Sequence, residues 1–584
     1  MEIGKQLEYS LYVYPRKIIN IGAYYLEERP CNKILTQDRS HSIIKRVLII
    51  EECSLNISRS NMEVIGIFGI LIISCFFLIW LWLKNRFNYW SSRNIANPPC
   101  SYIWGNMKSV LLQQCSFADI TLKHYEVFKS AGKKYGGIFM LWSPVFYPID
   151  LEIIKSIMQV DFQHFVDRGV YFNEKADPLS AHLFAIEGKK WKLLRNKLSP
   201  TFTSGKMKMM YETVVDCTVG LFRVMDKEIG NSVDIKDILG RFTTDIIGSC
   251  AFGLDINSLE NPDSEFREKG KSVFHRGLLE NLKQFLLFSM PNLMKNFNLK
   301  ATPNDVTDFF MNVVKNNVAY REKNNIFRKD FMHLLIQLKN KGKLVDDDKL
   351  DSENLTEDEN TITMEEIAAQ AFIFFEAGFE TSSTTMTFCL YELAKNKTIQ
   401  DRLRGEIQKV LKKHDGKLTY DTLMNMHYLE QVINETLRKY PPVPMLVRVC
   451  TKDYKIPDSD VILEKGTKVT IPLYGIQRDP DYYPDPDKFD PERFSEENKN
   501  SRPAFSFIPF GEGPRVCIGT RFGMMQTKVG LVALMLNYEI TVSKKTREPL
   551  QYDPQSFVTS TKGGIWLDLK KISPNTVELL PQSS

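Results

Sequence analysis

The chain has 584 residues, of which 43% are hydrophobic and 25% charged, so it is not a mainly disordered, collagen-like or low-complexity protein. Lysine and arginine exceed aspartate and glutamate by only five (76 against 71), which is too dilute a charge to indicate a nucleic-acid-binding protein. The ten cysteines are scattered without a Cys-x-x-Cys pair, so neither a disulfide framework nor a zinc knuckle is indicated. We therefore expect the main body of the protein to face a reducing compartment and to bind no nucleic acid.

An uncharged apolar segment covers residues 64–83, which is long enough to cross a hydrocarbon core of about 30 Å as a helix. A buried core helix and a cleaved signal peptide are weaker interpretations, because the apolar run is too long for either. Trp80 and Trp82 suit the membrane interface, and Lys84 and Arg86 follow directly. Because the positive charge lies on the C-terminal side, we predict a transmembrane anchor with the large domain in the cytosol.

The anchor divides the chain into four predicted regions. Residues 1–63 form an N-terminal extension of mixed charge without a clear period, and we expect Met62 to be the true initiator. The alternative is a real lumenal extension, in which Asn56-Ile57-Ser58 would be a glycosylation acceptor. After the anchor at 64–83, residues 84–103 are predicted to be a basic, proline-containing hinge. Residues 104–584 are predicted to form one large catalytic domain.

The large domain is predicted to be mainly α with small β-sheets. Amphipathic periodicity predicts long helices over residues 206–229, 365–395, 399–413 and 424–440. Short strands are expected at 137–140, 461–463 and 469–471. Residues 346–359 carry eight acidic side chains in fourteen positions, which is typical of a solvated loop. A capping box, Thr363 to Glu366, is predicted to start the next helix.

One cysteine stands in surroundings that favour chemistry over packing. Cys517 follows a loop with glycines at 511 and 513 and precedes Gly519 and a helical stretch. Exposed backbone N–H groups and the positive end of a helix both stabilise a thiolate. Because the other cysteines and the eight histidines supply no neighbouring ligand set, a tetrahedral zinc site is poorly supported, whereas one thiolate suffices as the axial ligand of haem iron. Arg515 is placed to pair with a carboxylate such as a haem propionate.

Three further patterns have both a structural and a functional interpretation. Glu435 and Arg438 lie at i and i+3 and share a helix face, as many surface pairs do. Trp191 and Arg195, at i and i+4, also share a face and could be a routine amphipathic turn. In residues 377–382, Thr381 can donate a hydrogen bond to a carbonyl one turn earlier and bend an otherwise apolar helix.

Residues 510–519 resemble the haem-binding signature of the cytochrome P-450 superfamily, Phe-x-x-Gly-x-Arg-x-Cys-x-Gly, and match it at every position. The resemblance covers roughly residues 90 to 570, and residues 241–253 are similar to insect microsomal, xenobiotic-metabolising members. It implies the cytochrome P-450 fold, with a single haem domain behind an N-terminal anchor in the endoplasmic reticulum membrane. It also implies haem b as cofactor, with Cys517 as the axial ligand of its iron.

The same resemblance assigns expected roles to the patterns above. Haem binding is expected from the aromatic, glycine and cationic side chains Phe510, Gly513, Gly519, Arg515, Trp191, Arg195 and Arg448. Glu435, Arg438 and Arg493 are expected to form a buried network behind the haem, which holds the cysteine loop in shape. Thr381 and Glu380 are expected to be catalytic, since this acid and alcohol resemble the family's oxygen-activation motif.

The implied reaction is monooxygenation of a lipophilic small molecule, such as a xenobiotic, plant toxin, insecticide, terpenoid or steroid. NADPH electrons would come from a separate NADPH-cytochrome reductase, with cytochrome b5 as a further partner, and the chain has no Gly-x-Gly-x-x-Gly of its own. Four basic residues at 189, 190, 192 and 197 would steer an acidic reductase.

The substrate cavity is expected to be lined by residues 170–184, 372–379, 443–447 and 557–560. Two other functions remain open on the sequence. One is a haem-thiolate isomerase or dehydratase that needs no reductase, and the other is a non-enzymatic haem carrier or sensor.

Overall fold

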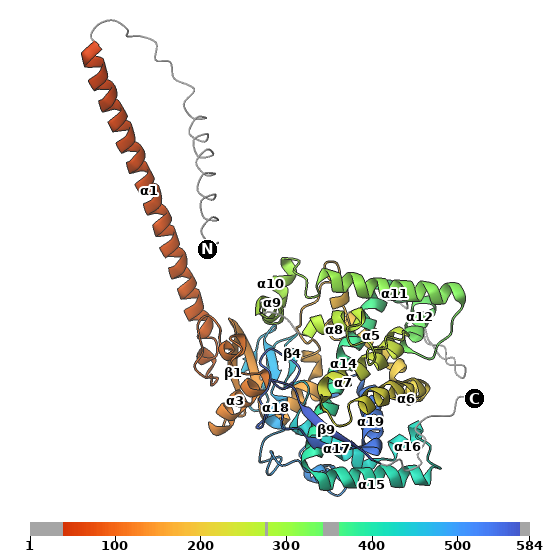
Figure 1. Ribbon diagram of the computed structural model, residues 1–584. Coiled ribbons are helices and arrows are strands. Elements are labelled where there is room, and N and C mark those ends of the chain that lie inside the picture. The colour runs from red at the N-terminus through yellow and green to blue at the C-terminus, as the bar shows by residue number, and fades with distance from the viewer. Residues whose placement is uncertain (1–38, 275–277, 343–360, 573–584) are drawn as a thin grey trace, which may run out of the picture. The chain divides into compact units, whose positions relative to one another are not determined.

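The computed structural model describes residues 39–274, 278–342 and 361–572 of the chain (Figure 1). It divides into two compact units at the boundary between Trp82 and Leu83. The predicted acidic loop at 346–359 and the first 38 residues of the predicted extension lie outside the described residues.

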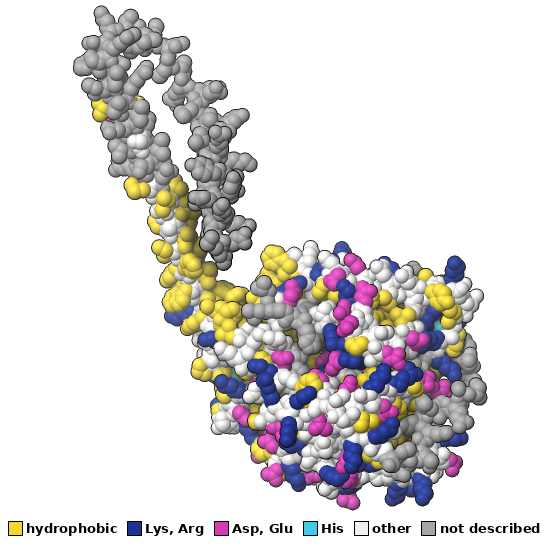
Figure 2. Space-filling view, viewed as in Figure 1, with side chains coloured by type: hydrophobic (Ala, Val, Ile, Leu, Met, Phe, Trp, Pro, Cys, Tyr) yellow, Lys and Arg dark blue, Asp and Glu magenta, His cyan; other side chains and the backbone are white. Residues whose placement is uncertain are grey.

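A single helix, α1 (Arg39–Phe87), contains the whole of the predicted anchor. By length and composition, one stretch among the described residues could cross a membrane, and it lies within Met62–Arg93. The side chains from Val64 to Trp82 are almost all exposed, and hydrophobic side chains cover this part of α1 in Figure 2. A helix that is apolar all round needs a lipid or protein environment, because water cannot solvate it favourably.

The larger unit, residues 83–584, is mainly helical, and the predicted fold class is confirmed. Its helices are α2 (Lys108–Leu111), α3 (Phe117–Ser130), α4 (Leu151–Lys155), α5 (Gly188–Leu198), α6 (Ser204–Lys227), α7 (Ile235–Ile247), α8 (Glu265–Phe274), α9 (Leu278–Ser289), α10 (Pro291–Asn296), α11 (Asn304–Asn324), α12 (Phe331–Lys341), α14 (Met364–Lys395), α15 (Lys397–Lys413), α16 (Tyr420–Met424), α17 (His427–Lys439), α18 (Leu473–Ile476) and α19 (Thr520–Asn537). The four predicted long helices correspond to α6, α14, α15 and α17, the last of which begins at His427, three residues later than predicted.

The strands form three small sheets. The largest has the order β1 (Tyr135–Met140), β2 (Ser143–Pro148), β7 (Lys468–Ile471) and β4 (Leu446–Val449), with β2 and β7 parallel and the other pairs antiparallel. A second sheet has the order β3 (Ser232–Asp234), β9 (Trp566–Lys571) and β8 (Tyr538–Val542), and β5 (Tyr454–Lys455) pairs with β6 (Ile462–Leu463). All three predicted strands are present, as β1, β6 and β7.

The segment predicted as a hinge is packed into the larger unit. Phe87, Trp90 and Ile95 are buried in the same apolar cluster as the β1–β2 hairpin. The Trp90 indole Nε1 donates a hydrogen bond to the carbonyl of Ile138 at 3.0 Å. Gly137 makes this contact possible, since a Cβ there would lie 2.3 Å from the Trp90 ring. Residues 84–103 therefore include an anchored segment of the fold, which their prolines and basic residues do not reveal.

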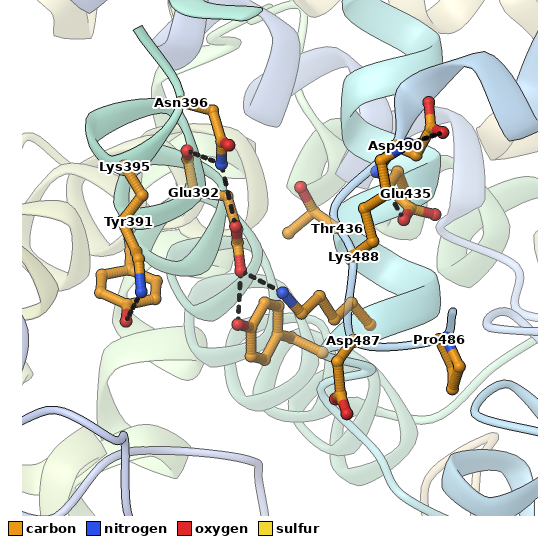
Figure 3. A network of polar contacts seen from close by, with 12 residues as sticks. Tyr391, Glu392, Lys395, Asn396, Glu435, Thr436, Pro486, Asp487, Lys488 and Asp490 are labelled. Carbon is orange, nitrogen blue, oxygen red and sulfur yellow. Dashed lines mark hydrogen bonds and ion pairs between the residues drawn. The ribbon is translucent and has the colours of Figure 1, made fainter. Parts of the chain in front are cut away.

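Helix α14 is the central element of the larger unit and packs against α7, α19, α11 and β8. Its start is the predicted capping box: Glu366 N donates to Thr363 Oγ1 at 3.1 Å, and Thr363 N donates to the Glu366 carboxylate at 3.0 Å. At its other end, buried Glu392 joins α14 to the end of α17, accepting hydrogen bonds from Lys439 and Tyr440 at 2.7 and 2.6 Å (Figure 3). The helix that carries Glu380 and Thr381 is thus fixed to the helix that carries Glu435 and Arg438.

Candidate cofactor and substrate site

A cavity of about 710 Å³ lies inside the larger unit, between α14 on one side and the loop that precedes α19 on another. Its wall is mostly apolar, which is typical of a site for a lipophilic small molecule or cofactor. Cys517, Phe510 and Gly519 from the predicted cysteine loop line it, as do the predicted haem-binding residues Trp191, Arg195, Arg448 and Arg515. The structure therefore brings these residues from three distant parts of the sequence to one cavity.

The cysteine loop presents its thiol to this cavity. Cys517 is a free, exposed cysteine, and its backbone N–H donates to the carbonyl of Phe510 at 2.9 Å, which closes the loop. Helix α19 begins three residues later at Thr520, as the sequence predicted. Gly513 does not line the cavity but turns the loop: its φ is +71°, and a Cβ there would lie 1.9 Å from the carbonyl oxygen of Met158. Glycine is required at this position for both reasons.

Arg515 ties the cysteine loop to the segment that precedes α5. Its buried guanidinium donates to the carbonyls of Val166 at 2.8 Å and Ile186 at 2.9 Å. It also stacks on the ring of Trp191 at 4.1 Å, and Asp167 is its carboxylate neighbour at 3.6 Å. Burial is the main reason that the pKa of Arg515 falls to about 9.

Arg448, on β4, brings a second buried cation to the cavity. Burial lowers its pKa to about 10. Nη1 donates to the carbonyl of Val447 at 2.8 Å, but among the residues that the structure describes no group accepts a hydrogen bond from the buried Nε. A buried donor without an acceptor costs free energy, so this atom indicates that an anionic or carbonyl group belongs in the cavity.

A fourth arginine, Arg168, lies on the same wall and was not predicted from the sequence. Arg168 donates to the carbonyl of Arg515 and to that of Phe184, both at 3.1 Å. Burial, followed by the nearby charges of Arg448 and Arg515, holds the pKa of Arg168 well below its usual range. No motif marks this residue, and its only sequence signal is its place just before the predicted cavity segment 170–184.

The residues present fit a haem group. Four guanidinium groups, from Arg168, Arg195, Arg448 and Arg515, line a cavity whose apolar walls could cover a flat ring. Such a cluster of cations is suited to a ligand with two carboxylates. The thiol of Cys517 supplies a soft ligand for iron on the same wall.

Glu380 and Thr381, which are neighbours on α14, line different pockets. Thr381 lines the cavity and donates to the carbonyl of Ala377 at 2.7 Å, which is the predicted hydrogen bond one turn back. The predicted bend is not seen as a break, since α14 is helical without interruption from Met364 to Lys395. Glu380 is buried on another face and pairs with Lys236 of α7 at 2.9 Å, lining a separate pocket.

Each of the four predicted cavity segments contributes to the wall. Helix α9 and residue Phe117 of α3 were missed, although they add aromatic surface. The rings of Phe117 and Phe557 have centroids 5.4 Å apart, and Phe288 of α9 lies 6.5 Å from Phe557. An apolar helix of this kind cannot be distinguished in sequence from a core helix.

The three residues of the predicted network meet in the structure. Arg438 donates to Glu435 through Nε at 2.7 Å and Nη2 at 2.8 Å, and Arg493 Nε lies 3.5 Å from the same carboxylate. Glu435 also accepts from the backbone N–H of Asp490 at 2.9 Å, so the pair is linked to the loop before the short helix Pro491–Phe494.

The four basic residues of the α5 region differ in their surroundings. Lys189 and Lys192 are exposed, whereas Lys190 pairs with Glu174 at 2.8 Å and Lys197 donates to the carbonyl of Thr361 at 3.3 Å. Two of the four are therefore committed to contacts within the chain.

Known proteins resemble this chain over most of its length. The family described as Cytochrome P450 matches residues 100–567. "Probable cytochrome P450 6a14" of Drosophila melanogaster is 45% identical over 495 residues, which are 83% of this chain and 96% of the relative. Cytochrome P450 6a2 of the same fly is 42% identical over 509 residues, 86% of this chain and 99% of the relative. With its cysteine loop, arginine-lined cavity and central helix in place, the chain belongs to the cytochrome P450 family.

Proposed function

We propose that the protein is an NADPH- and reductase-dependent monooxygenase of lipophilic small molecules. The balanced reaction is RH + O₂ + NADPH + H⁺ → ROH + H₂O + NADP⁺. The observation that carries the proposal is the free thiol of Cys517 in the wall of an arginine-lined apolar cavity that also contains Thr381. Haem, when bound there, would supply the iron that activates dioxygen and receives the electrons.

The chain's own residues would hold the cofactor, supply protons and bind the substrate. Cys517 would bind the iron as a thiolate and donate electron density to it. Arg168, Arg195, Arg448 and Arg515 would pair with the haem carboxylates, which fixes the cofactor's orientation. Thr381 would hold a hydrogen bond where protons are consumed, with Glu380 as the acid of the same motif. The apolar wall would exclude water and bind the substrate.

The aromatic character of the cavity favours a flat or terpenoid-like lipophilic substrate from outside or inside the organism. Electrons would come from NADPH-cytochrome reductase, with cytochrome b5 as a second donor. The exposed lysines Lys189 and Lys192 would attract an acidic partner surface.

We further propose that residues 64–83 anchor the protein in the endoplasmic reticulum membrane, with the larger unit in the cytosol. Support comes from the apolar helix and from the basic residues that follow it. Alkaline carbonate extraction of microsomes should leave the full chain in the membrane and release a variant that lacks residues 64–83. Protease added to intact microsomes should digest the larger unit, and a protected larger unit would contradict the orientation.

The deciding experiment is the reduced, carbon monoxide-treated spectrum together with product formation. The purified protein with reductase and NADPH is expected to show the red-shifted Soret band of thiolate ligation and to hydroxylate members of a panel of plant toxins, insecticides and steroid precursors. Cys517→Ala should abolish both, whereas Cys100→Ala, at a half-buried cysteine that does not line the cavity, should change neither. Conversion of a peroxide substrate without NADPH would favour an isomerase or dehydratase, and bound haem without NADPH consumption would favour a carrier.

A further inference from the structure

His182 lies in the wall of the cavity that contains Cys517, in the loop between the short helix Pro178–Ser180 and α5. Its side chain is half-buried, yet burial lowers the pKa of its imidazole from 6.5 to about 3, and the charge of Arg168 adds to this effect. The exposed part of the ring therefore faces the enclosed cavity and not bulk water. The imidazole is consequently neutral at physiological pH.

The ring nitrogens of His182 are not used by the protein itself. Among the residues that the structure describes, none forms a hydrogen bond with either nitrogen, and Nδ1 is buried as well. Because Nδ1 has no accessible surface while the ring lines the cavity, Nε2 is the nitrogen that a bound molecule can reach. A polar group kept from bulk water without a partner costs free energy, so this side chain indicates that a polar atom of a ligand belongs beside it.

The backbone on both sides of the His182 ring is fixed before any molecule binds. The N–H of Leu183 donates to Gln370 Oε1 of α14 at 2.9 Å, and the carbonyl of Leu183 accepts from Arg515 at 3.4 Å. The carbonyl of His182 accepts from the N–H of Ile186 at 3.0 Å. A ligand therefore pays little ordering entropy when it forms a hydrogen bond with this side chain.

Other polar side chains of the cavity wall already donate to carbonyls of the protein. Thr381 and Thr385 donate to the carbonyls one turn earlier on α14, at 2.7 and 2.9 Å. Gln284 of α9 donates to the carbonyl of Ala301 at 2.9 Å. His182 differs from them because it keeps Nε2 available for a molecule in the cavity.

Haem carboxylates are a poor match for this nitrogen. Two carboxylates would meet four guanidinium groups, from Arg168, Arg195, Arg448 and Arg515, and charged donors bind carboxylates more strongly than a neutral imidazole does. A hydroxyl group fits the neutral ring better, because it both donates and accepts and can pair with Nε2 in either tautomer. The mostly apolar, aromatic remainder of the wall suits the carbon skeleton of such a molecule.

We propose that Nε2 of His182 binds a hydroxyl group of the substrate, so that this contact selects lipophilic alcohols and phenols. The hydrogen bond would hold one end of the molecule at the wall and thereby decide which carbon is presented for oxidation. The inference rests on the proposed monooxygenase function and names the class of molecule on which it acts.

The test measures binding to the haem-loaded, oxidised protein by equilibrium dialysis, without reductase or NADPH. The probes are 2-naphthol and 2-methylnaphthalene, which have nearly the same shape and differ in a hydroxyl group. His182→Leu is expected to raise the Kd for 2-naphthol about tenfold and to change the Kd for 2-methylnaphthalene less than about twofold.

Three further variants make the comparison specific. His182→Gln keeps an amide near the position of Nε2 and should bind 2-naphthol within about threefold of the wild type. Val273→Ala removes apolar surface from the same wall and should weaken the binding of both probes by the same factor. If H182L does not load haem, His182→Phe takes its place, since it keeps a flat ring without nitrogens.

Equal effects of H182L or H182F on the two probes would overturn the inference, as would a wild type that binds 2-methylnaphthalene but not 2-naphthol. Faster transfer of haem from H182L to apomyoglobin, with unchanged selectivity between the probes, would assign the ring to the haem carboxylates and also overturn it. Because dialysis needs no electrons, these results leave the proposed function standing. A wild type that discriminates through His182 but oxidises no NADPH with reductase overturns the proposed function instead, and His182 then belongs to a carrier.

Discussion

The guanidinium of Arg438 and the carboxylate of Glu435, one turn apart on α17, form two hydrogen bonds while both side chains are completely buried. Arg438 also donates to the carbonyls of Gln477 at 3.0 Å and Pro486 at 2.8 Å. One guanidinium therefore joins α17 to two points of the loop that follows α18, residues 477–490.

Arg438→Ala is expected to destabilise the protein by about 3–5 kcal/mol, because it leaves the Glu435 charge buried without its main partner. The free energy of unfolding in urea and the haem content should fall together. Arg493→Ala is the matched control with a smaller expected loss, since Arg493 is partly exposed and stands 3.5 Å from the same carboxylate. Equal losses for the two variants would contradict the central role of Arg438.

Arg168→Ala is expected to weaken haem retention. The variant removes one of four cations from the cavity, and the loss of a charge-assisted hydrogen bond should speed haem release about tenfold. Transfer of haem to excess apomyoglobin measures this rate. Arg223→Ala, at an exposed residue of α6 paired with Glu260, should release haem at the wild-type rate. A wild-type rate for R168A as well would show that Arg168 does not hold the cofactor.

Lys189→Glu combined with Lys192→Glu is expected to raise the KM for the reductase about tenfold at low salt, because opposite charges steer association. Raising the ionic strength should slow the wild type more than this variant. Lys412→Glu reverses a charge at an exposed residue of α15 and serves as the control. If Lys412→Glu raises the KM for the reductase as much as the double variant does, the net charge of the protein, and not the α5 surface, controls association with the reductase.

His124 is expected to make the fold sensitive to mild acid. His124 is one of the buried residues of α3, and this burial lowers its pKa from 6.5 to about 4. The unfolded chain therefore takes up a proton on this histidine at a higher pH than the folded protein, so stability falls as the pH drops from about 6.5 to about 4.

The slope attributable to one such group is about 1.4 kcal/mol per pH unit. His124→Gln should flatten the dependence of the urea midpoint on pH in this window, whatever its effect at neutral pH. An unaltered slope would mean that His124 is not kept neutral by the fold.

Much of the site could be predicted because its signals are local. The cysteine loop, the capping box at Thr363 and the Glu435–Arg438 pair each lie within ten residues of sequence, where backbone geometry fixes which groups meet. The back-bond of Thr381 is of the same kind.

The remaining features depend on contacts between distant segments. Arg168 is held at the cavity by the carbonyls of Phe184 and Arg515, and Glu380 lines a pocket separate from the large cavity, where it pairs with Lys236 of α7. The burial of Trp90 likewise depends on the space left by Gly137. Hydrophobic periodicity and motif spacing carry no information on such contacts between distant segments.

The clasp between Arg515 and the carbonyls of residues 166–186 has a practical consequence for protein engineering. A segment grafted from a relative in place of residues 166–186 would have to offer its carbonyl groups to the same guanidinium, or the loop that bears Cys517 would lose its support. Exchanging this segment therefore risks displacing Cys517, whereas single substitutions on α9, which supplies none of the hydrogen-bond acceptors of Arg515 among the described residues, leave that support in place.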